Sequence, residues 1–239
     1  MFKKSLVLLI ALFVIGSQAY SETVEEIIAK NIKAHGGQEK FENMETYQLE
    51  MKMNVMGMSI PSKIFTKKPD KMRMEMSMMG QNIITVLNGD KAWLSQGGTV
   101  TELPADQFDQ VKGQMEGQSN FFENQFINYK EKGMEITLQG TEQLDGKNYF
   151  KLFIKDENGS EITMFIDTQT YIEYKMITTQ QAMGTPTEME IYMKNNKWVN
   201  GLLIAHKIEM FSDGEPAGDI TLENFKINEP IDDSMFILK

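Results

Sequence analysis

The chain has 239 residues, enough for one or two domains, and contains 20 methionines but no cysteine, which excludes disulfides, zinc–thiolate sites, iron–sulfur clusters and cysteine nucleophiles. Its 34 acidic and 24 basic residues give a formal net charge of −10, and Arg73 is the one arginine. Such a chain is poorly suited to binding nucleic-acid phosphates, and an anionic membrane surface repels it.

The N-terminus has the pattern of a secretory signal peptide. Two lysines precede the apolar run Leu6–Ile15, which is too short to span a bilayer, and small residues suit cleavage after Ala19. We therefore expect residues 1–19 to be removed and residues 20–239 to form a single domain. An exported protein without cysteines suits a bacterial periplasm, where it folds without any need of oxidation.

A first amphipathic helix is predicted over residues 24–35. Thr23 and Glu26 form a capping box at its start, and apolar residues recur after them at helical spacing. The pair Gly36-Gly37 supplies the stop signal. A shorter helical piece is expected at 38–44.

From Thr46 onward the apolar residues alternate with polar ones, which predicts strands. Turn signals divide this region, and Asn88-Gly89 is a strong hairpin signal among them. The sequence therefore predicts about six antiparallel strands in succession, at 46–55, 60–66, 72–78, 82–87, 91–95 and 99–103.

Residues 104–132 break the strand pattern. Phe108, Val111 and Met115 recur at intervals of three and four, which predicts an amphipathic helix that Gly113 and Gly117 weaken. A second apolar helical stretch is expected to follow, with its apolar positions at Phe121, Phe122, Phe126, Ile127 and Tyr129.

The remainder of the chain returns to strand-like alternation. Seven more strands are predicted, at 134–144, 147–155, 160–166, 171–181, 186–194, 201–211 and 218–228. A sheet of ten or more strands usually curls. We therefore predict a mainly β (α+β) fold, in which helices cover the open side of one large, curled antiparallel sheet.

Signals for catalysis are nearly absent. His35 and His206 are far apart in sequence and outside any metal-ligand spacing, so a structural role is expected for each. No phosphate-binding loop, dinucleotide fingerprint or nucleophile elbow occurs. Asp232-Asp233 is interpreted as a polar turn. We expect a protein that is not an enzyme and has no cofactor or metal.

The informative feature is the methionine, because ten of the 20 lie between Met44 and Met79. Alternate residues of a strand share a face, so many of these side chains should lie together. Three interpretations stay open. The methionines pack an ordinary core, or they line an adaptable cavity for acyl chains, or their soft sulfurs bind Cu(I).

Several segments together resemble the LolA-like family of periplasmic lipoprotein carriers, including its outer-membrane lipoprotein-sorting proteins. They extend over nearly all of the chain after the predicted signal peptide, and they are residues 65–75, 87–93, 167–170, 200–207 and 228–236. The resemblance implies an unclosed β-barrel capped by helices. It also implies a cavity for the acyl chains of a lipoprotein or lipid, an inner-membrane donor and an outer-membrane acceptor.

The alternation and the resemblance together supply candidate site residues. The lipid-binding candidates are Met51, Met53, Met72, Met74, Met76, Met78, Ile84, Val86 and Trp93. The lid candidates are Lys68, Phe108, Phe122 and Phe126. In the carriers an arginine directly before a proline clamps the lid. Lys68 occupies that position here, without the planar donor fork of arginine.

The function that the sequence favours is therefore a monomeric periplasmic carrier, which shields acyl chains and delivers its cargo toward the outer membrane. Two alternatives remain. One is an envelope sensor that uses the same pocket to regulate a protein partner. The other is a methionine-rich periplasmic copper-binding protein.

Overall fold

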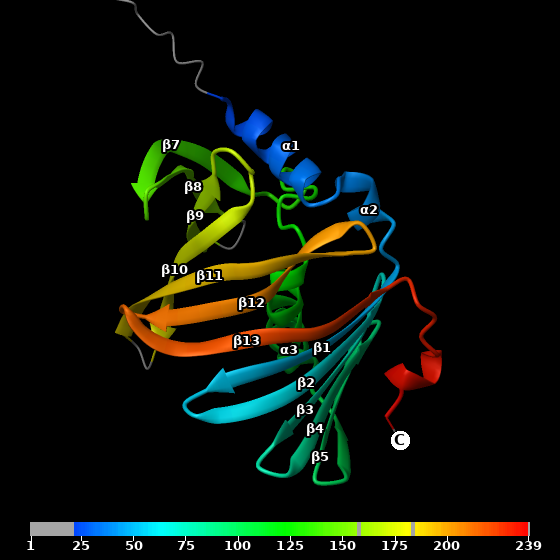
Figure 1. The fold of residues 1–239 in the computed structure, drawn as a ribbon. Helices are drawn as coiled ribbons and strands as arrows, with labels where there is room; N and C mark the ends of the chain where they lie inside the picture. Colours follow the sequence, from blue (N-terminus) through cyan, green and yellow to red (C-terminus); the bar gives the residue numbers. More distant parts are fainter. Residues whose placement is uncertain (1–21, 157–158, 183–184, 239) are drawn as a thin grey trace, which may run out of the picture.

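Thirteen strands form one antiparallel sheet in the computed structural model, which describes residues 22–156, 159–182 and 185–238 (Figure 1). The predicted signal peptide at residues 1–19 lies outside the described residues. The strands are β1 (Thr46–Val55), β2 (Met58–Lys67), β3 (Lys71–Met78), β4 (Gln81–Asn88), β5 (Lys91–Gln96), β6 (Thr99–Glu102), β7 (Glu135–Leu144), β8 (Lys147–Lys155), β9 (Glu161–Asp167), β10 (Glu173–Ala182), β11 (Thr185–Val199), β12 (Leu202–Ser212) and β13 (Glu215–Ile227).

The sheet consists of two meanders joined at their first and last strands. Its order is β6-β5-β4-β3-β2-β1-β13-β12-β11-β10-β9-β8-β7, so β1 and β13 pair in the middle. Within the described residues β6 and β7 are the two edges and do not pair with each other. The predicted architecture is confirmed: the sheet curls like a barrel that has not closed (Figure 1).

Helices lie before the first strand, between the two meanders and after the last strand. They are α1 (Val24–Ala34), α2 (Gln38–Glu42), α3 (Ala105–Ser119) and the short 3₁₀ helices η1 (Asn120–Phe122) and η2 (Asp233–Phe236). The Thr23–Glu26 capping box is present, as predicted. Among the described residues, none of these helices combines the length and the apolar character that a membrane span requires.

The predicted second helix over 121–129 does not form beyond η1. Asn124 redirects the backbone, because its side-chain oxygen accepts a hydrogen bond from the Phe126 N–H at 2.9 Å. Asn128 then adopts a left-handed conformation with φ of 55°. Short polar side chains that bond to nearby backbone compete with helix formation in this way, so Phe126 is presented by a turn.

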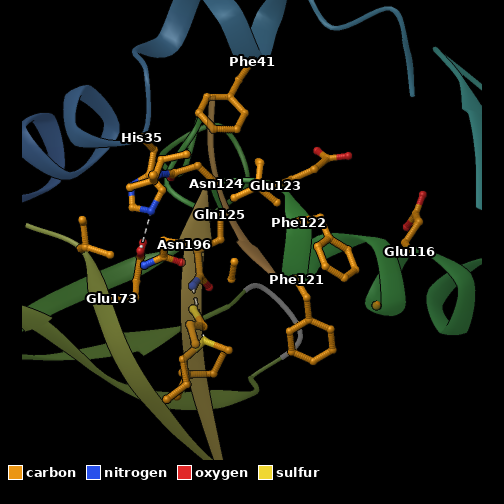
Figure 2. Close-up of a pocket in the computed structure, with 18 of the residues that line it drawn as sticks. His35, Phe41, Glu116, Phe121, Phe122, Glu123, Asn124, Gln125, Glu173 and Asn196 are labelled. Carbon is orange, nitrogen blue, oxygen red and sulfur yellow. Dashed lines mark hydrogen bonds and ion pairs between the residues drawn. The ribbon is translucent and has the colours of Figure 1, made fainter. Parts of the chain in front are cut away.

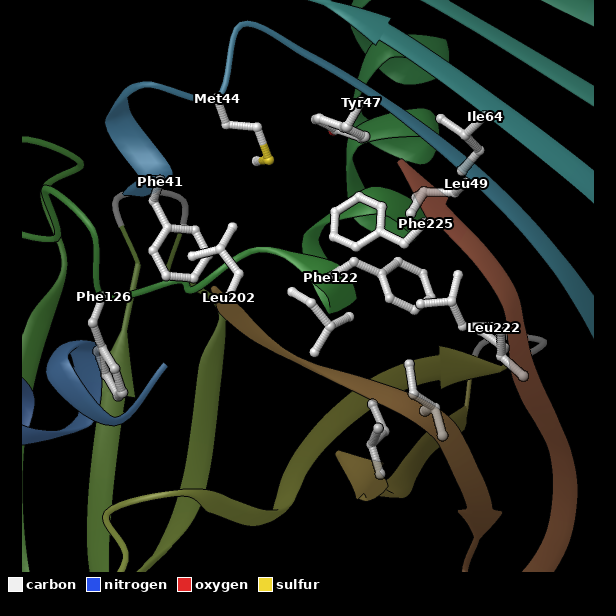
Figure 3. Close-up of a cluster of buried hydrophobic side chains, with 14 of the residues drawn as sticks. Phe41, Met44, Tyr47, Leu49, Ile64, Phe122, Phe126, Leu202, Leu222 and Phe225 are labelled. Carbon is white, nitrogen blue, oxygen red and sulfur yellow. The ribbon is translucent and has the colours of Figure 1, made fainter. Parts of the chain in front are cut away.

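The inner face of the sheet carries the main hydrophobic core (Figure 3). Leu49 lies opposite Phe225 on one neighbouring strand and opposite Ile64 on the other, and Ile64 in turn lies opposite Met74. All four side chains are buried. Cross-strand rows of this kind hold the two meanders together through their shared apolar face.

The lid segment, α3 with the turns that follow it, packs on this inner face. Met115, Phe122 and Phe126 are buried in the same cluster as the strand residues. Phe108 and Val111 of α3 are half-buried against it, while most other side chains of that helix are exposed. The lid is therefore held by one narrow apolar stripe.

The C-terminal segment covers the outer face of the first meander. Phe236 is fully buried against Val86, and the Arg73 guanidinium donates to the Met235 carbonyl at 2.9 Å. Asp233 accepts ion pairs from two strand lysines. The turn predicted at Asp232-Asp233 is confirmed, since Asp232 caps η2 through the Ser234 N–H.

Candidate functional site

A cavity of about 470 Å³ lies between the lid segment and the inner face of the second meander (Figure 2). Strands β9 to β12 and the loops before β9 and β10 supply one wall, and the end of α1, α2, the last turns of α3, η1 and the segment between η1 and β7 supply the rest. Most of the lining is apolar, and it includes Phe41, Phe121, Phe122, Met134, Ile162, Met176, Met193 and Ile204. This volume is within the range of small-ligand sites, which are mostly apolar with a few polar groups.

Among the exposed polar residues that line the cavity, negative charges outnumber positive ones. Three carboxylates, those of Glu116, Glu123 and Asp156, line the cavity together with the Lys132 ammonium, and all four side chains are exposed or half-exposed. The solvent side of the cavity is therefore acidic.

The lid contacts the second meander through weak hydrogen bonds to methionine sulfur atoms. The Gln125 amide nitrogen lies 3.5 Å from the Met176 sulfur and 3.8 Å from the Met164 sulfur. Thioether sulfur is a weak hydrogen-bond acceptor. These contacts position the turn after η1 over the wall without fixing it strongly.

A buried polar cluster forms the end of the cavity next to α1. His35 caps α1, and its Nε2 lies 2.9 Å from Glu173 Oε2 (Figure 2). The other carboxylate oxygen accepts from the Asn31 side-chain amide at 2.8 Å. Asn124 of the lid segment donates to the Asn31 side-chain oxygen at 2.8 Å. The cluster thus joins α1, β10 and the lid.

The pKa values in this cluster favour a charged pair. Burial by itself lowers the pKa of His35, but the Glu173 charge, its hydrogen bond and the Asn31 carbonyl outweigh burial, and the pKa is raised above 6.5. Burial by itself raises the pKa of Glu173, but His35 and the Asn31 amide outweigh it and the pKa is lowered below 4.5. A charged, hydrogen-bonded pair is the arrangement in which buried charges persist.

The backbone of the α1–α2 connection is also fixed against the sheet. The Leu203 N–H donates to the His35 carbonyl at 3.1 Å. Gly36 has φ of +116°, and a Cβ there would lie 2.2 Å from the Gly201 carbonyl oxygen. Only glycine allows this approach, so the sequence signal interpreted as a helix stop also positions His35 beside Glu173.

The predicted methionine wall is on the inner face but does not line the cavity. Met51, Met72 and Met74 are at most 6% exposed and pack within the core, while Met53 and Met76 are partly buried beside it. Met78 is 38% exposed near the end of β3. Under the lid the first meander is therefore filled by these side chains, and the cavity of about 470 Å³ lies over the second meander.

The prediction that Ile84, Val86 and Trp93 belong to the same wall is wrong. The register of β3 with β4 places Met74 opposite Thr85 and Met72 opposite Leu87. Since successive side chains alternate between faces, the three residues point outward, where they pack with the C-terminal segment.

The four predicted lid residues have different surroundings. Phe122 lines the cavity, and Phe126 and Phe108 pack on the core cluster. The prediction that Lys68 contacts the lid is not supported. Lys68 is exposed in the β2–β3 turn, and within the described residues its side chain makes no hydrogen bond or ion pair with the lid. Its place in the turn, at the end of β2, does not bring it to α3.

Sequence reasoning missed the lining residues of the second meander and the Glu173 carboxylate. Met134, Met176 and Met193 were available as the same residue type that drew attention to the first meander. Glu173 carried no signal, because a buried and an exposed glutamate look alike in an alternating strand. His35 was expected to be structural, and its contacts agree with this.

No model of a protein family and no curated protein sequence matches the chain. Solved structures do. A DUF1329 family protein from Desulfovibrio piger has a TM-score of 0.58 at 12% identity, over 91% of this chain and 98% of that one. A LolA superfamily protein from Nitrosomonas europaea has a TM-score of 0.56 at 13% identity, over 91% and 99%.

A third structure, described as an outer membrane lipoprotein-sorting protein domain from Vibrio parahaemolyticus, has a TM-score of 0.53 at 12% identity, over 88% of this chain and 94% of that one. Likeness at these identities concerns the fold. The chain has a LolA-like fold, as the sequence predicted.

Proposed function

We propose that this protein is a carrier that shields one acyl chain of a lipid or lipoprotein in the cavity under its lid, without catalysing a reaction. The observation that carries the proposal is the apolar cavity of about 470 Å³ on the inner face of an unclosed sheet. Its wall contains the flexible side chains of Met134, Met176 and Met193, which adapt to irregular apolar partners.

The size of the cavity favours a single chain. An engineered apolar cavity of about 150 Å³ holds one benzene ring, so on this scale the cavity takes on the order of eighteen carbon atoms. That is one long acyl chain. Each buried methylene contributes about 0.8 kcal/mol, which is enough to hold such a chain away from water.

The lid provides a route for release. Its apolar stripe is narrow, its contacts to the Met164 and Met176 sulfurs are weak, and Gly113 and Gly117 within α3 meet no neighbouring atoms where a Cβ would lie. Helix α3, most of whose side chains are exposed, opens at a lower cost in free energy than the turn that carries buried Phe122, Asn124 and Phe126. We infer that cargo enters and leaves as this helix moves.

The buried acid–base pair at the end of the cavity has structural partners. His35 and Glu173 pair with each other, and Asn31 and Asn124 complete the cluster. Within the described residues no group of three or more histidine, aspartate or glutamate side chains has a geometry suited to a metal ion. In this proposal His35 and Glu173 hold α1 and β10 together beside the bound chain.

The proposal places the protein in the periplasm as a monomer, with residues 1–19 as its signal peptide. Its cargo would come from a donor in the inner membrane and pass to an acceptor at the outer membrane. The LolA-like fold supports this assignment, and the acidic surface would keep the loaded carrier off anionic lipid until an acceptor receives the cargo.

Binding of a fluorescent fatty-acid analogue tests the cavity directly. Ile162→Phe fills the cavity and should weaken binding at least tenfold, while thermal unfolding shows that the variant folds. Ile177→Phe is the matched control, because Ile177 follows cavity-lining Met176 in β10 and faces the other side of the sheet. Equal affinities of the two variants for the analogue would contradict the proposal that the acyl chain binds in this cavity.

Native mass spectrometry of protein purified from the cell envelope identifies the cargo. One lipid or one lipoprotein chain per protein supports the proposal and names the cargo class. Tight binding of two or more chains would contradict the single-chain capacity while keeping the carrier function. Absence of any lipid or probe binding would contradict the carrier function itself.

A further inference from the structure

Two hairpin turns of the first meander expose large apolar side chains. Met56 in the β1–β2 turn is 90% exposed, and Met79 in the β3–β4 turn is 87% exposed. Beside them, Met58 and Met78 are 39% and 38% exposed. These four residues form what we call the methionine rim.

The backbone of both turns disfavours methionine. Met56 has φ of 51° and Met79 has φ of 52°, each followed by a glycine that also has positive φ. Two-residue hairpin loops of this conformation prefer Asn, Asp or Gly. The same chain follows that preference elsewhere: the equivalent first turn positions, with φ of 48° to 49°, are Asp145, Asn200 and Asp213.

Charged residues are missing from the stretches of the first meander that carry the methionine rim, whereas the neighbouring β12–β13 turn at the same end of the sheet carries Asp213 and Glu215. Residues 53–62, 76–89 and 92–101 contain no Asp, Glu, Lys, Arg or His, although 24% of the whole chain is charged. In an antiparallel meander the β1–β2, β3–β4 and β5–β6 turns lie at one end of the strands. Figure 1 shows the β1–β2 and β3–β4 turns along the rim of the sheet away from α2.

We propose that the methionine rim inserts into the interface of a lipid bilayer with neutral, zwitterionic headgroups. Uncharged turns enter the interface without desolvating charge, and flexible thioether side chains fit lipid without needing a complementary surface. The body of the protein, with its net charge of −10, is repelled by anionic lipid. This distribution of charge favours contact through the uncharged turns of the first meander.

A protein partner fits these observations less well. Stable interfaces bury about 1,000 Å² or more in complementary surfaces, whereas the rim presents methionines on separate turns. The proposal goes beyond cargo binding, because it requires neither the cavity nor the lid.

Flotation with phosphatidylcholine vesicles tests the rim. The double variant Met56→Asn, Met79→Asn places at both turns a residue type that this backbone conformation prefers. It should therefore fold with a melting temperature no lower than that of the wild type. We expect its partition onto vesicles to fall at least tenfold. Trp198→Asn is the matched control, since Trp198 is 62% exposed near the β11–β12 turn at the other end of the sheet, and should leave partition unchanged.

Equal flotation of the wild type and the double variant, or no flotation of the wild type, would overturn the proposal. Sedimentation of the two proteins without vesicles tests whether the methionine rim binds a second copy of the chain. A dimer formed by the wild type but not by the double variant would also overturn the proposal. Binding of the fatty-acid analogue by the double variant should match the wild type, which separates failure of the rim from failure of the cavity.

Discussion

Glu173 of β10 and His35 at the end of α1 form an ion pair whose nearest oxygen and nitrogen are 2.9 Å apart. The pair connects the first helix of the chain to the second meander. Through Asn31 and Asn124 the same cluster reaches the lid. Its integrity should therefore affect both the stability of the fold and the closure of the cavity.

Glu173→Gln should lower the free energy of unfolding by about 3 kcal/mol, because removing one partner of a buried pair leaves the other buried without its counter-charge. Urea denaturation measures the change. Glu223→Gln is the control, since Glu223 pairs with Lys52 where both side chains are well exposed, and its loss should change stability by less than about 1 kcal/mol. Equal effects would contradict a structural role for the buried pair.

The stability of the wild type should depend on pH through this pair. The pKa of His35 is raised by Glu173 in the folded state, so its contribution is complete below the ordinary value of 6.5 and is lost as pH rises through the raised value. The pKa of Glu173 is lowered, so its contribution is complete above 4.5 and is lost as pH falls through the lowered value.

Urea denaturation between pH 5 and pH 9 should show a decline in stability that begins near pH 6.5 and is complete once the pH has passed the raised pKa of His35, and this decline should be absent or weaker in Glu173→Gln. Without the carboxylate, burial lowers the pKa of His35. Parallel stability curves for the wild type and the variant would show that the two groups are not coupled.

Two glycines should respond in opposite directions to substitution by alanine. Gly36→Ala places a Cβ against the Gly201 carbonyl at positive φ and should destabilise the protein by more than about 1 kcal/mol. Gly113→Ala in α3 meets no atom within 4 Å and should stabilise by about 0.5–1 kcal/mol. Thermal unfolding compares them, and destabilisation by Gly113→Ala would contradict a helical Gly113.

Phe236→Ala should detach the C-terminal segment from the outer face. Phe236 is fully buried beside Val86 and near partly buried Trp93, so its removal should cost about 3 kcal/mol. In a Trp198→Phe background, the fluorescence of Trp93 should shift to longer wavelength as its surroundings become wetter. Ile237→Ala, at a residue that is 50% exposed, should leave the emission unchanged.

The element pattern was predictable because periodicity and turn chemistry act locally. The Thr23–Glu26 box starts α1, and all thirteen strands lie within a few residues of their predicted positions. The predicted second helix after η1 failed because the Asn124 side chain bonds to the Phe126 backbone, an alternative that a hydrophobic pattern does not reveal.

The site was less predictable because it depends on register and on where the lid packs. Met74 and Val86 both belong to alternating apolar runs, and only the pairing of β3 with β4 places them on opposite faces. Whether an inner face is filled or hollow is decided by the lid: Met51 is packed, whereas Met176 borders the cavity. No count of methionines along the chain contains that information.

The pairing of β1 with β13 in the middle of the sheet sets an order of assembly. Each meander forms from neighbouring hairpins, but Leu49 must wait for Phe225, which is nearly the whole length of the chain away. Loop closure of that span is slow relative to hairpin formation. A newly synthesised chain therefore presents the inner face of its first meander to solvent before the last strand arrives, and the interval before the two halves meet is when it is most open to aggregation.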